Sequence, residues 1–205
     1  GALAINRDGT VIARGAIQST INGEDSGAIR VEQWNGIAWE QRGEQFLGIA
    51  GTQRHRVALS ALGDVLVTAT VFPEVTTVYD WDGLEWRQRG ESFTGGFQVD
   101  VDASGDRVVV GYYSAGKATV YEWDGSNWVQ MGSELDSSGL TSFFGYEVRI
   151  SGDGETIAIG DVKSCSVRPF AWNGTTWQRK GGDLKGVGSG TCGVGSINNH
   201  SINFD

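Results

Sequence analysis

The carboxylates in the tight turns of this sequence are the side chains best suited to hold a metal ion. Asp102 and Asp106 lie four residues apart in the segment DASGD. Calcium needs about six to eight oxygen ligands, which come largely from carboxylates at alternating positions. The corresponding turns elsewhere read NRDGT, SALGD and SGDGE, and SALGD lacks such a pair. Asp102 and Asp106 are therefore weak calcium candidates, and ordinary tight turns are the favoured interpretation.

No local pattern in the chain indicates a catalytic centre. Its two histidines, His55 and His200, do not stand near a cysteine or serine at a spacing typical of a metal site or a catalytic triad. Nucleophile-elbow, phosphate-loop and zinc-protease motifs are missing as well. We therefore expect no enzyme, no catalytic residue and no cofactor, although residues spread over distant segments would escape this search.

All eight tryptophans belong to one motif, W-[DN]-G-x-x-W-x-x-x-G, which the chain uses four times. Asn-Gly and Asp-Gly tolerate the positive φ of tight hairpin turns, and the flanking residues suit β-strands. Each copy predicts a β-hairpin with both indoles on one face. We expect packing between strands or blades, with sugar stacking as the alternative. The pairs are Trp34 and Trp39, Trp81 and Trp86, Trp123 and Trp128, and Trp172 and Trp177.

A second hairpin precedes each of these motifs, so that every repeat contains four strands. Its turns are marked by Gly9, Gly63, Gly105 and Gly154. Four antiparallel strands in a period of about 40 to 50 residues are typical of a β-propeller blade. The sequence predicts an all-β propeller, or a segment of one, with blades at 1–46, 47–94, 95–136 and 137–186. Residues 187–205 are expected to begin a fifth repeat.

The segments FFGYEVRISGDGETIAIG and VYEWDGSNWVQMG together resemble the FG-GAP-like propeller repeats of extracellular proteins. Similar repeats occur along large surface proteins of marine microalgae and bacteria. The resemblance covers residues 1–186, although the Phe-Gly pair is intact only at Phe144 and Gly145. It implies an extracellular or cell-surface location. It implies little about the ligand, because propellers carry many unrelated functions.

The net charge and the distribution of apolar residues narrow the classes of molecule that the chain could bind. The formal net charge of −9 argues against nucleic acid, which is bound through basic patches. The chain has no apolar run long enough for membrane insertion. We therefore expect protein partners, or other domains of the same larger protein, with glycans as an alternative. No signal peptide is visible at Gly1, so we expect a mature form or part of a longer protein.

Several further positions are candidates for modification or binding. Cys165 and Cys192 are predicted to form a disulfide, because the loop between strands two and three and the connection between blades emerge on the same face of a propeller. An even cysteine count also suits an oxidising compartment. Asn173 and Asn199 begin glycosylation sequons. Irregular segments that could serve as binding loops contain Asn22, Glu24, Asp25, Phe72, Tyr112 and Tyr113.

Together these observations favour a non-catalytic, extracellular structural or protein-interaction module that forms part of a larger surface or filament protein. A glycan-binding, lectin-like propeller is the alternative, and a propeller hydrolase comes third.

Overall fold

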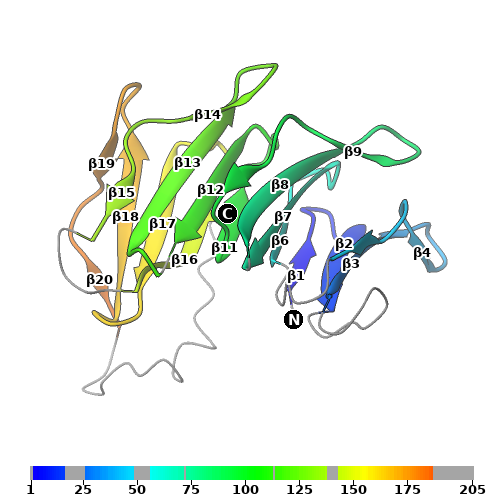
Figure 1. Cartoon of the computed structure of the whole chain (residues 1–205), viewed down its shortest axis with the longest axis horizontal. Coiled ribbons are helices and arrows are strands. Elements are labelled where there is room, and N and C mark those ends of the chain that lie inside the picture. The colour runs from blue at the N-terminus through cyan, green and yellow to red at the C-terminus, as the bar shows by residue number, and fades with distance from the viewer. Residues whose placement is uncertain are drawn as a thin grey trace.

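The computed structural model describes residues 2–16, 26–48, 56–71, 73–112, 114–137 and 143–186. These residues form four antiparallel sheets and no helix (Figure 1). The sheets follow one another in chain order along an arc, with the first and last at its two ends (Figure 1). The predicted fold class, an all-β propeller segment of antiparallel blades, is confirmed. Within this part of the chain, no helix is long and apolar enough to span a membrane.

Each sheet is one blade, and the blades are numbered 1 to 4 along the chain. Blade 1 contains β1 (Leu3–Ile5), β2 (Val11–Ala16), β3 (Ala28–Trp34), β4 (Trp39–Gln41) and β5 (Phe46–Leu47). Blade 2 contains β6 (Arg56–Leu59), β7 (Val65–Val71), β8 (Glu74–Trp81), β9 (Trp86–Gln88) and β10 (Phe93–Thr94). Blade 3 contains β11 (Gln98–Val101), β12 (Arg107–Tyr112), β13 (Lys117–Trp123), β14 (Trp128–Gln130) and β15 (Leu135–Asp136). Blade 4 contains β16 (Phe144–Ile150), β17 (Thr156–Asp161), β18 (Ser166–Trp172), β19 (Trp177–Arg179) and β20 (Leu184–Lys185).

The outermost strand of every blade is split into two short segments. In blade 1 both β4 and β5 pair with β3, and the same arrangement recurs in the other three sheets. The break contains a glycine with positive φ, such as Gly43 at 76° or Gly90 at 67°. A residue with a Cβ rarely adopts this conformation, so the glycine of the tryptophan motif ends the first segment.

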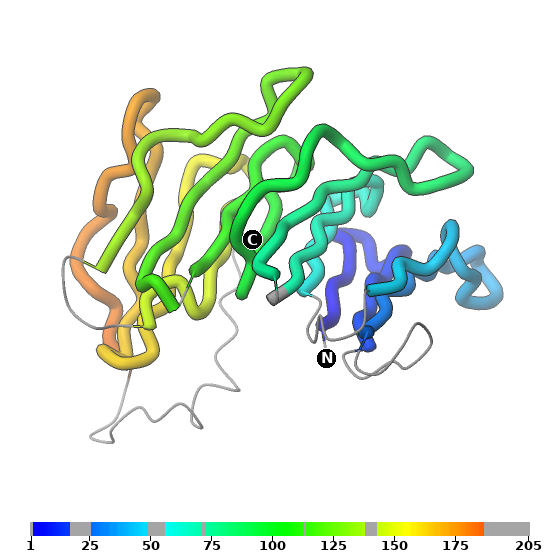
Figure 2. The backbone as a smooth tube through the Cα atoms, in the orientation of Figure 1, coloured from blue at the N-terminus to red at the C-terminus, as the bar shows by residue number. Residues whose placement is uncertain are grey.

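The turn of each outer hairpin depends on the Asn or Asp that follows the first tryptophan. In blade 4 the Asn173 Oδ1 accepts hydrogen bonds from the backbone N–H groups of Thr175 and Thr176. The equivalent side chains of blades 1 to 3 accept the same pair of bonds. Only a short side chain with an acceptor oxygen closes the turn in this way, which explains the [DN]-G pair. These hairpins project from the outer side of the arc (Figure 2).

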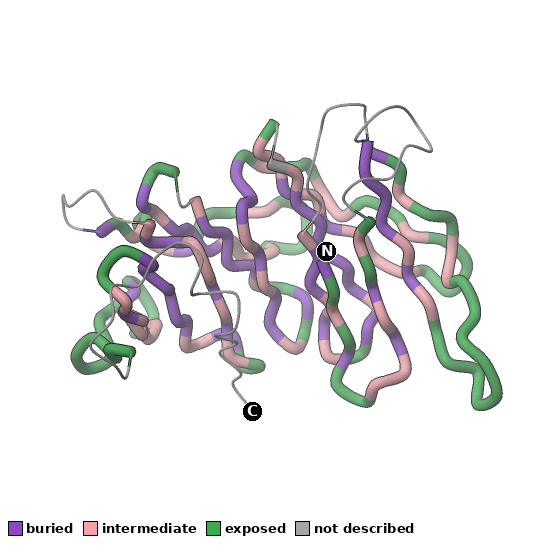
Figure 3. Tube along the Cα trace, turned by 90° about the horizontal axis from the view of Figure 1, so that it is seen from below, coloured by how far each residue is buried: buried purple, intermediate pink, exposed green. Residues whose placement is uncertain are grey.

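Neighbouring blades pack face to face, with their innermost strands β1, β6, β11 and β16 adjacent in order. Three apolar clusters fill the spaces between the four blades. Val108 and Val110 of blade 3 point toward blade 2, whereas Val109 points toward blade 4. This alternation buries both faces of the middle strands, and the exposed residues gather in the turns and along the outermost strands (Figure 3).

The tryptophan pairs of blades 2, 3 and 4 lie at the junctions with the preceding blades. The second indole of a pair donates its Nε1–H to a carbonyl of the preceding blade at 2.9 Å: Trp86 to Arg42, Trp128 to Arg89, and Trp177 to Met131. The first indole covers the positive-φ glycine that follows that carbonyl: Trp81 on Gly43, Trp123 on Gly90, and Trp172 on Gly132. A Cβ on any of these glycines would lie 2.6 to 2.8 Å from the ring, so only glycine fits.

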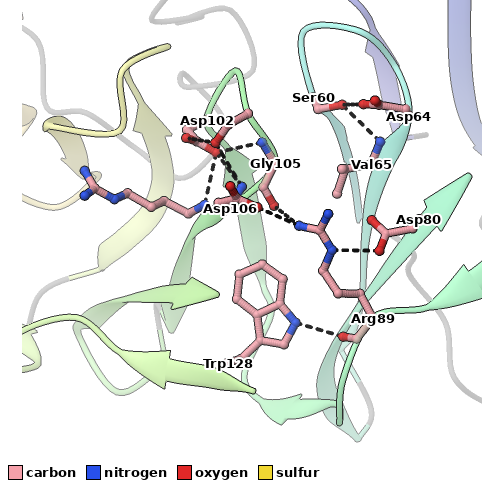
Figure 4. Close-up of polar contacts among 11 residues, drawn as sticks. Ser60, Asp64, Val65, Asp80, Arg89, Asp102, Gly105, Asp106 and Trp128 are labelled. Carbon is pink, nitrogen blue, oxygen red and sulfur yellow. Dashed lines mark hydrogen bonds and ion pairs between the residues drawn. The ribbon is translucent and has the colours of Figure 1, made fainter. Parts of the chain in front are cut away.

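An arginine strengthens the junction between blades 2 and 3 (Figure 4). The Arg89 guanidinium contacts the Asp80 carboxylate of its own blade at 2.8 Å. It also contacts the Asp106 carboxylate of the next blade at 2.9 Å. The backbone carbonyl of Arg89 accepts the Trp128 bond described above, so this residue holds the next blade through both its side chain and its main chain.

Candidate functional site

Of the two calcium candidates, Asp102 closes the turn that contains it, whereas the Asp106 carboxylate pairs with Arg89 of the preceding blade. Asp102 Oδ1 accepts hydrogen bonds from the backbone N–H groups of Gly105, Asp106 and Arg107 (Figure 4). The equivalent residues of the other blades, Asn6, Ser60 and Ser151, each accept the bond from the corresponding backbone N–H. This position therefore closes the inner hairpin in all four blades, whatever its charge. No group of three metal-ligating side chains occurs in the described parts of the chain.

Tyr112, named above as a binding-loop residue, lies in strand β12 at a junction between blades. Its hydroxyl donates a hydrogen bond to the Thr94 carbonyl of blade 2 at 2.7 Å. Its ring fills the space where a Cβ on Gly95 would be. Burial raises the pKa of the Tyr112 phenol, so the hydroxyl keeps its proton and remains a donor. These contacts make Tyr112 part of the packing between blades 2 and 3.

Other predicted positions lie outside the described residues. They are Asn22, Glu24, Asp25, Phe72, Tyr113, Cys192 and Asn199, together with the partial fifth repeat at 187–205. Cys165 is described, with a φ of 50°, but its predicted partner is not, so the disulfide stays a prediction. Asn173 is exposed at its hairpin turn, and its glycosylation is likewise a prediction.

A polar cluster that the motif search missed lies on the innermost strands of blades 3 and 4. It consists of Gln98 and Asp100 on β11 and of Glu147 and Arg149 on β16. The Asp100 Oδ2 accepts the backbone N–H of Ile150 at 3.0 Å, which fixes the carboxylate beside β16. The four side chains alternate along their strands with apolar residues of the two clusters, and none of the four belongs to either cluster. The apolar residues are Val99, Val101, Val148 and Ile150.

Glu147 lies at the centre of this cluster. Its Oε1 accepts a hydrogen bond from the Gln98 Nε2 at 3.1 Å and contacts the Arg149 guanidinium at 2.6 Å. A β-bulge between Phe144 and Glu147 shifts the register of β16. Bulges redirect side chains and are common beside active sites. All four members of the cluster are partly buried, so they are screened from bulk water without being sealed in the core.

Arg56 adds a second positive charge on the neighbouring inner strand β6. Its Nε donates a hydrogen bond to the Phe97 carbonyl at 2.9 Å, and its guanidinium lies 5.0 Å from the centre of the Phe97 ring. The Phe97 ring in turn packs 4.9 Å from the ring of Tyr146. The inner strands of blades 2, 3 and 4 therefore all contribute to one polar region beside an aromatic pair.

The environment of this cluster changes the acidity of its carboxyl groups. Burial raises the pKa of Asp100 to about 6, because the loss of solvation outweighs the attraction of Arg149. Burial also raises the pKa of Glu147 against the opposing charges of Arg149 and Arg56. A carboxyl group that titrates near neutral pH can both accept and release a proton, which is the property that general acid–base catalysis requires.

The sequence contains a pattern that corresponds to this cluster, but the pattern is not specific to a functional site. The strand FQVDV carries Gln98 and Asp100 between valines, and YEVRI carries Glu147 and Arg149 in the same pattern. Alternation of this kind also describes an ordinary strand with one face in solvent. The polar residues could be recognised as a cluster only once the fold had shown that they lie on innermost strands.

Comparison with known proteins supports the fold. No family model matches the sequence, and none of the curated proteins matches it. Two crystal structures are similar to it: a "putative 6-phosphogluconolactonase" from Bacteroides fragilis (12% identity, TM-score 0.64) and another from Bacteroides uniformis (11%, 0.65). A protein of unknown function from Desulfotomaculum acetoxidans is also similar (10%, 0.65). The matches cover 90% of this chain and 54 to 55% of those chains, so the chain spans about half their length.

This finding corrects the function expected from the sequence. The expectation of a non-catalytic structural or interaction module is wrong in light of two structural neighbours that each carry the name "putative 6-phosphogluconolactonase". At this level of identity the likeness shows the fold of the chain and leaves its activity to be tested. It does not bear on the resemblance to FG-GAP-like repeats or on the extracellular location, which both stay predictions.

Proposed function

We propose that this chain contributes the catalytic centre of a propeller hydrolase that opens small, anionic sugar lactones. The observation that carries the proposal is the meeting of Asp100, Glu147 and Arg149 on the innermost strands of blades 3 and 4. Ligand sites in propellers of this type are expected where inner strands from several blades converge. The substrate class is suggested by the described activity of two proteins that share the fold.

In the proposed reaction Asp100 is the group that moves the proton. Its carboxylate accepts a proton from a water molecule while the water oxygen bonds to the lactone carbonyl carbon. The ring carbon–oxygen bond then breaks, and the ring oxygen takes the proton back from Asp100 to become a hydroxyl. The product is the open hydroxy acid. The raised pKa of Asp100 supports this role, since a proton carrier works best with a pKa near the working pH.

Arg149 and Arg56 are the groups proposed to hold the anionic part of the substrate. Guanidinium groups bind phosphate and carboxylate through paired hydrogen bonds. Arg149 is also paired with Glu147, which keeps its guanidinium in place on β16 before the substrate arrives. Two arginines in one polar region would favour a phosphorylated lactone over an uncharged one, even though the whole chain carries a formal net charge of −9.

The test is acid release from 6-phosphogluconolactone and from the unphosphorylated gluconolactone, corrected for spontaneous hydrolysis. We expect Asp100→Asn to lower kcat by about 10²-fold or more, as is usual for loss of a general base. Arg149→Gln is expected to raise KM for the phosphorylated lactone more than for the unphosphorylated one. Glu85→Gln is the matched control, because Glu85 lies in an exposed outer hairpin, where its carboxylate pairs with Arg87.

Two outcomes would reject the proposal. The first is a wild-type chain that releases no acid from either lactone above the spontaneous rate. The second is an Asp100→Asn variant with the same kcat as the Glu85→Gln control.

A further inference from the structure

The outer hairpin turns of the four blades share one backbone geometry but differ in one functional group. Blades 1 and 4 have an amide at the turn, in Asn35 and Asn173, whereas blades 2 and 3 have a carboxyl group, in Asp82 and Asp124. A glycine with a φ of 95° to 99° follows each of the four residues. Each side-chain Oδ1 accepts two backbone N–H groups at 2.7 to 2.9 Å. The reactivity of an amide and of a carboxylate can therefore be compared in the same setting.

These turns are open to solvent in every blade. The four turn residues and the glycines after them are exposed, and outside the adjacent residues no described atom lies within 4 Å of a Cβ placed on any of those glycines. Blades 2 and 3 have a neighbouring blade on both sides, and their turns are as open as those of blades 1 and 4. The exposure of the turns therefore does not depend on what lies beyond blade 1 or blade 4. All four hairpins project from the outer side of the arc (Figure 2).

An asparagine that precedes a glycine can lose ammonia in an intramolecular reaction. The backbone nitrogen of the glycine bonds to the asparagine Cγ, its proton passes through water to Nδ2, and the Cγ–Nδ2 bond breaks to release ammonia. Water then opens the five-membered succinimide ring that has formed. Opening at one carbonyl gives aspartate, and opening at the other gives isoaspartate, in which the main chain runs through Cγ. One water is consumed and one ammonia is released, with no change in oxidation state.

The geometry of the turn favours this reaction at both asparagines. When the glycine nitrogen bonds to Cγ, negative charge develops on Oδ1, and two backbone N–H groups already point at that oxygen at 2.8 to 2.9 Å. Fixed N–H donors at a developing oxyanion are among the largest sources of rate enhancement in enzymes. The attacking nitrogen belongs to Gly36 or Gly174, and neither residue has a Cβ that would obstruct its approach.

The carboxyl groups of blades 2 and 3 are protected from the same reaction by their charge. An aspartate cyclises only when its carboxyl group is protonated, because the anion repels the attacking nitrogen and has no neutral group to release. The hydrogen bond from Arg87, together with the backbone N–H groups of the turn, lowers the pKa of Asp82 to about 2. The backbone N–H groups of Asn127 and Ser126 lower the pKa of Asp124. Both carboxyl groups are therefore ionised at neutral pH.

We propose that Asn35 and Asn173 are sites of spontaneous deamidation, whereas Asp82 and Asp124 in the equivalent turns do not react. The aspartate product is compatible with the fold, because Asp82 and Asp124 hold the same turn with the same two hydrogen bonds. This modification is independent of the proposed lactone chemistry.

The isoaspartate product has a different consequence, because it lengthens the turn by one backbone atom. Trp172 and Trp177 pair directly across the turn of Asn173. The Trp177 Nε1–H also donates to the Met131 carbonyl of blade 3 at 2.9 Å. A longer turn shifts the two indoles relative to each other, so isoaspartate at this position should weaken the junction between blades 3 and 4.

The test is peptide mapping by mass spectrometry after incubation of the folded chain at pH 8. The chain is produced without glycans, because a sugar on the Asn173 Nδ2 would block the release of ammonia. We expect the peptides with Asn35 and Asn173 to deamidate about tenfold or more faster than the peptide with Asn127, which is exposed but precedes Trp128, because a bulky following residue holds the attacking nitrogen away from Cγ. Asn22 also precedes a glycine but lies outside the described residues, so its peptide is scored separately.

Two controls separate the products and the role of the turn. Asn173→Asp supplies the aspartate product directly and should unfold at the same temperature as wild type. An isoaspartyl methyltransferase should label aged wild type at positions 35 and 173. Deamidation of Asn173 no faster than that of Asn127, or isoaspartate at Asp82 or Asp124 as fast as at Asn173, would overturn the proposal. A rate in the folded chain far below that in the urea-unfolded chain would also overturn it, because the turn would then protect the amide.

Discussion

Replacing Asp100 by asparagine should stabilise the protein at neutral pH. The asparagine oxygen can still accept the Ile150 N–H bond, so the change removes the charge and keeps the contact. The pKa of Asp100 is about 6 in the folded chain against an ordinary value of 3.8. The difference of 6 − 3.8 = 2.2 corresponds to ~3 kcal/mol at 1.36 kcal/mol for each pKa unit. Because Asp100 is only partly buried, we expect a gain of ~1 to 3 kcal/mol at pH 8.

The contribution of Asp100 to the free energy of unfolding changes with pH in one definite direction. The folded state binds the Asp100 proton more tightly than the unfolded state does. The contribution of this group to stability is therefore fully present below about pH 4 and is lost as the pH rises through about 6. Wild type and Asp100→Asn should accordingly have similar stability near pH 4 and should diverge above it.

Urea unfolding at a series of pH values measures this difference directly. The free energy of unfolding of wild type is subtracted from that of Asp100→Asn at each pH, which cancels the contributions of the other carboxylates. The Glu85→Gln variant, which removes one exposed carboxylate, serves as the control for the loss of a single negative charge. A difference for Asp100→Asn that is the same at pH 4 and pH 8, or that falls with rising pH, would refute the reasoning. A gain in stability combined with a loss of lactone hydrolysis would indicate a residue kept for function.

Three further predictions concern the junctions and the cysteines. Trp128→Phe loses the indole N–H bond to blade 2 but keeps an aromatic ring. It should lower the free energy of unfolding by ~1 to 2 kcal/mol in urea titration, because the partly buried Arg89 carbonyl loses its donor. Gly105→Ala should destabilise more than Gly125→Ala in thermal unfolding: both glycines have positive φ, but only at Gly105 would the new Cβ lie 2.4 Å from a valine of the preceding blade. Equal losses would contradict this. Cys165 and Cys192 should give no free thiol in the denatured, unreduced protein, and two titratable thiols would exclude the disulfide.

Much of the local structure could be predicted from short patterns. The pair of tryptophans around Asn-Gly or Asp-Gly predicts the outer hairpin, because both the turn and the alternation of the strands are decided within about ten residues. The structure pairs Trp123 directly with Trp128 across that hairpin, with ring centres 5.4 Å apart. The split of the outermost strand was not predicted. It falls at the positive-φ glycine of the motif, which an indole of the next blade covers in blades 1 to 3.

The roles of individual side chains were less predictable. Asp102 carries a carboxylate, as a calcium ligand often does. In the other blades, however, Asn6, Ser60 and Ser151 accept the equivalent hydrogen bond without a charge. Comparing the four turns position by position would have shown that any short acceptor suffices there. Asp100 lies two residues before Asp102, and the other repeats have no carboxylate at the equivalent position. It was therefore not predicted as a site residue.

The sequence by itself determined the repeat, the order of the strands and the hairpin turns, because these follow from hydrophobic alternation and from the conformational demands of glycine, asparagine and aspartate over short spans. Only the tertiary structure decided which side chains meet between blades. The bonds of Trp128 to Arg89 and of Ile150 to Asp100 join residues 39 and 50 positions apart. Contacts over such separations depend on how one sheet stacks on the next, and this packing geometry leaves no fixed spacing in the chain.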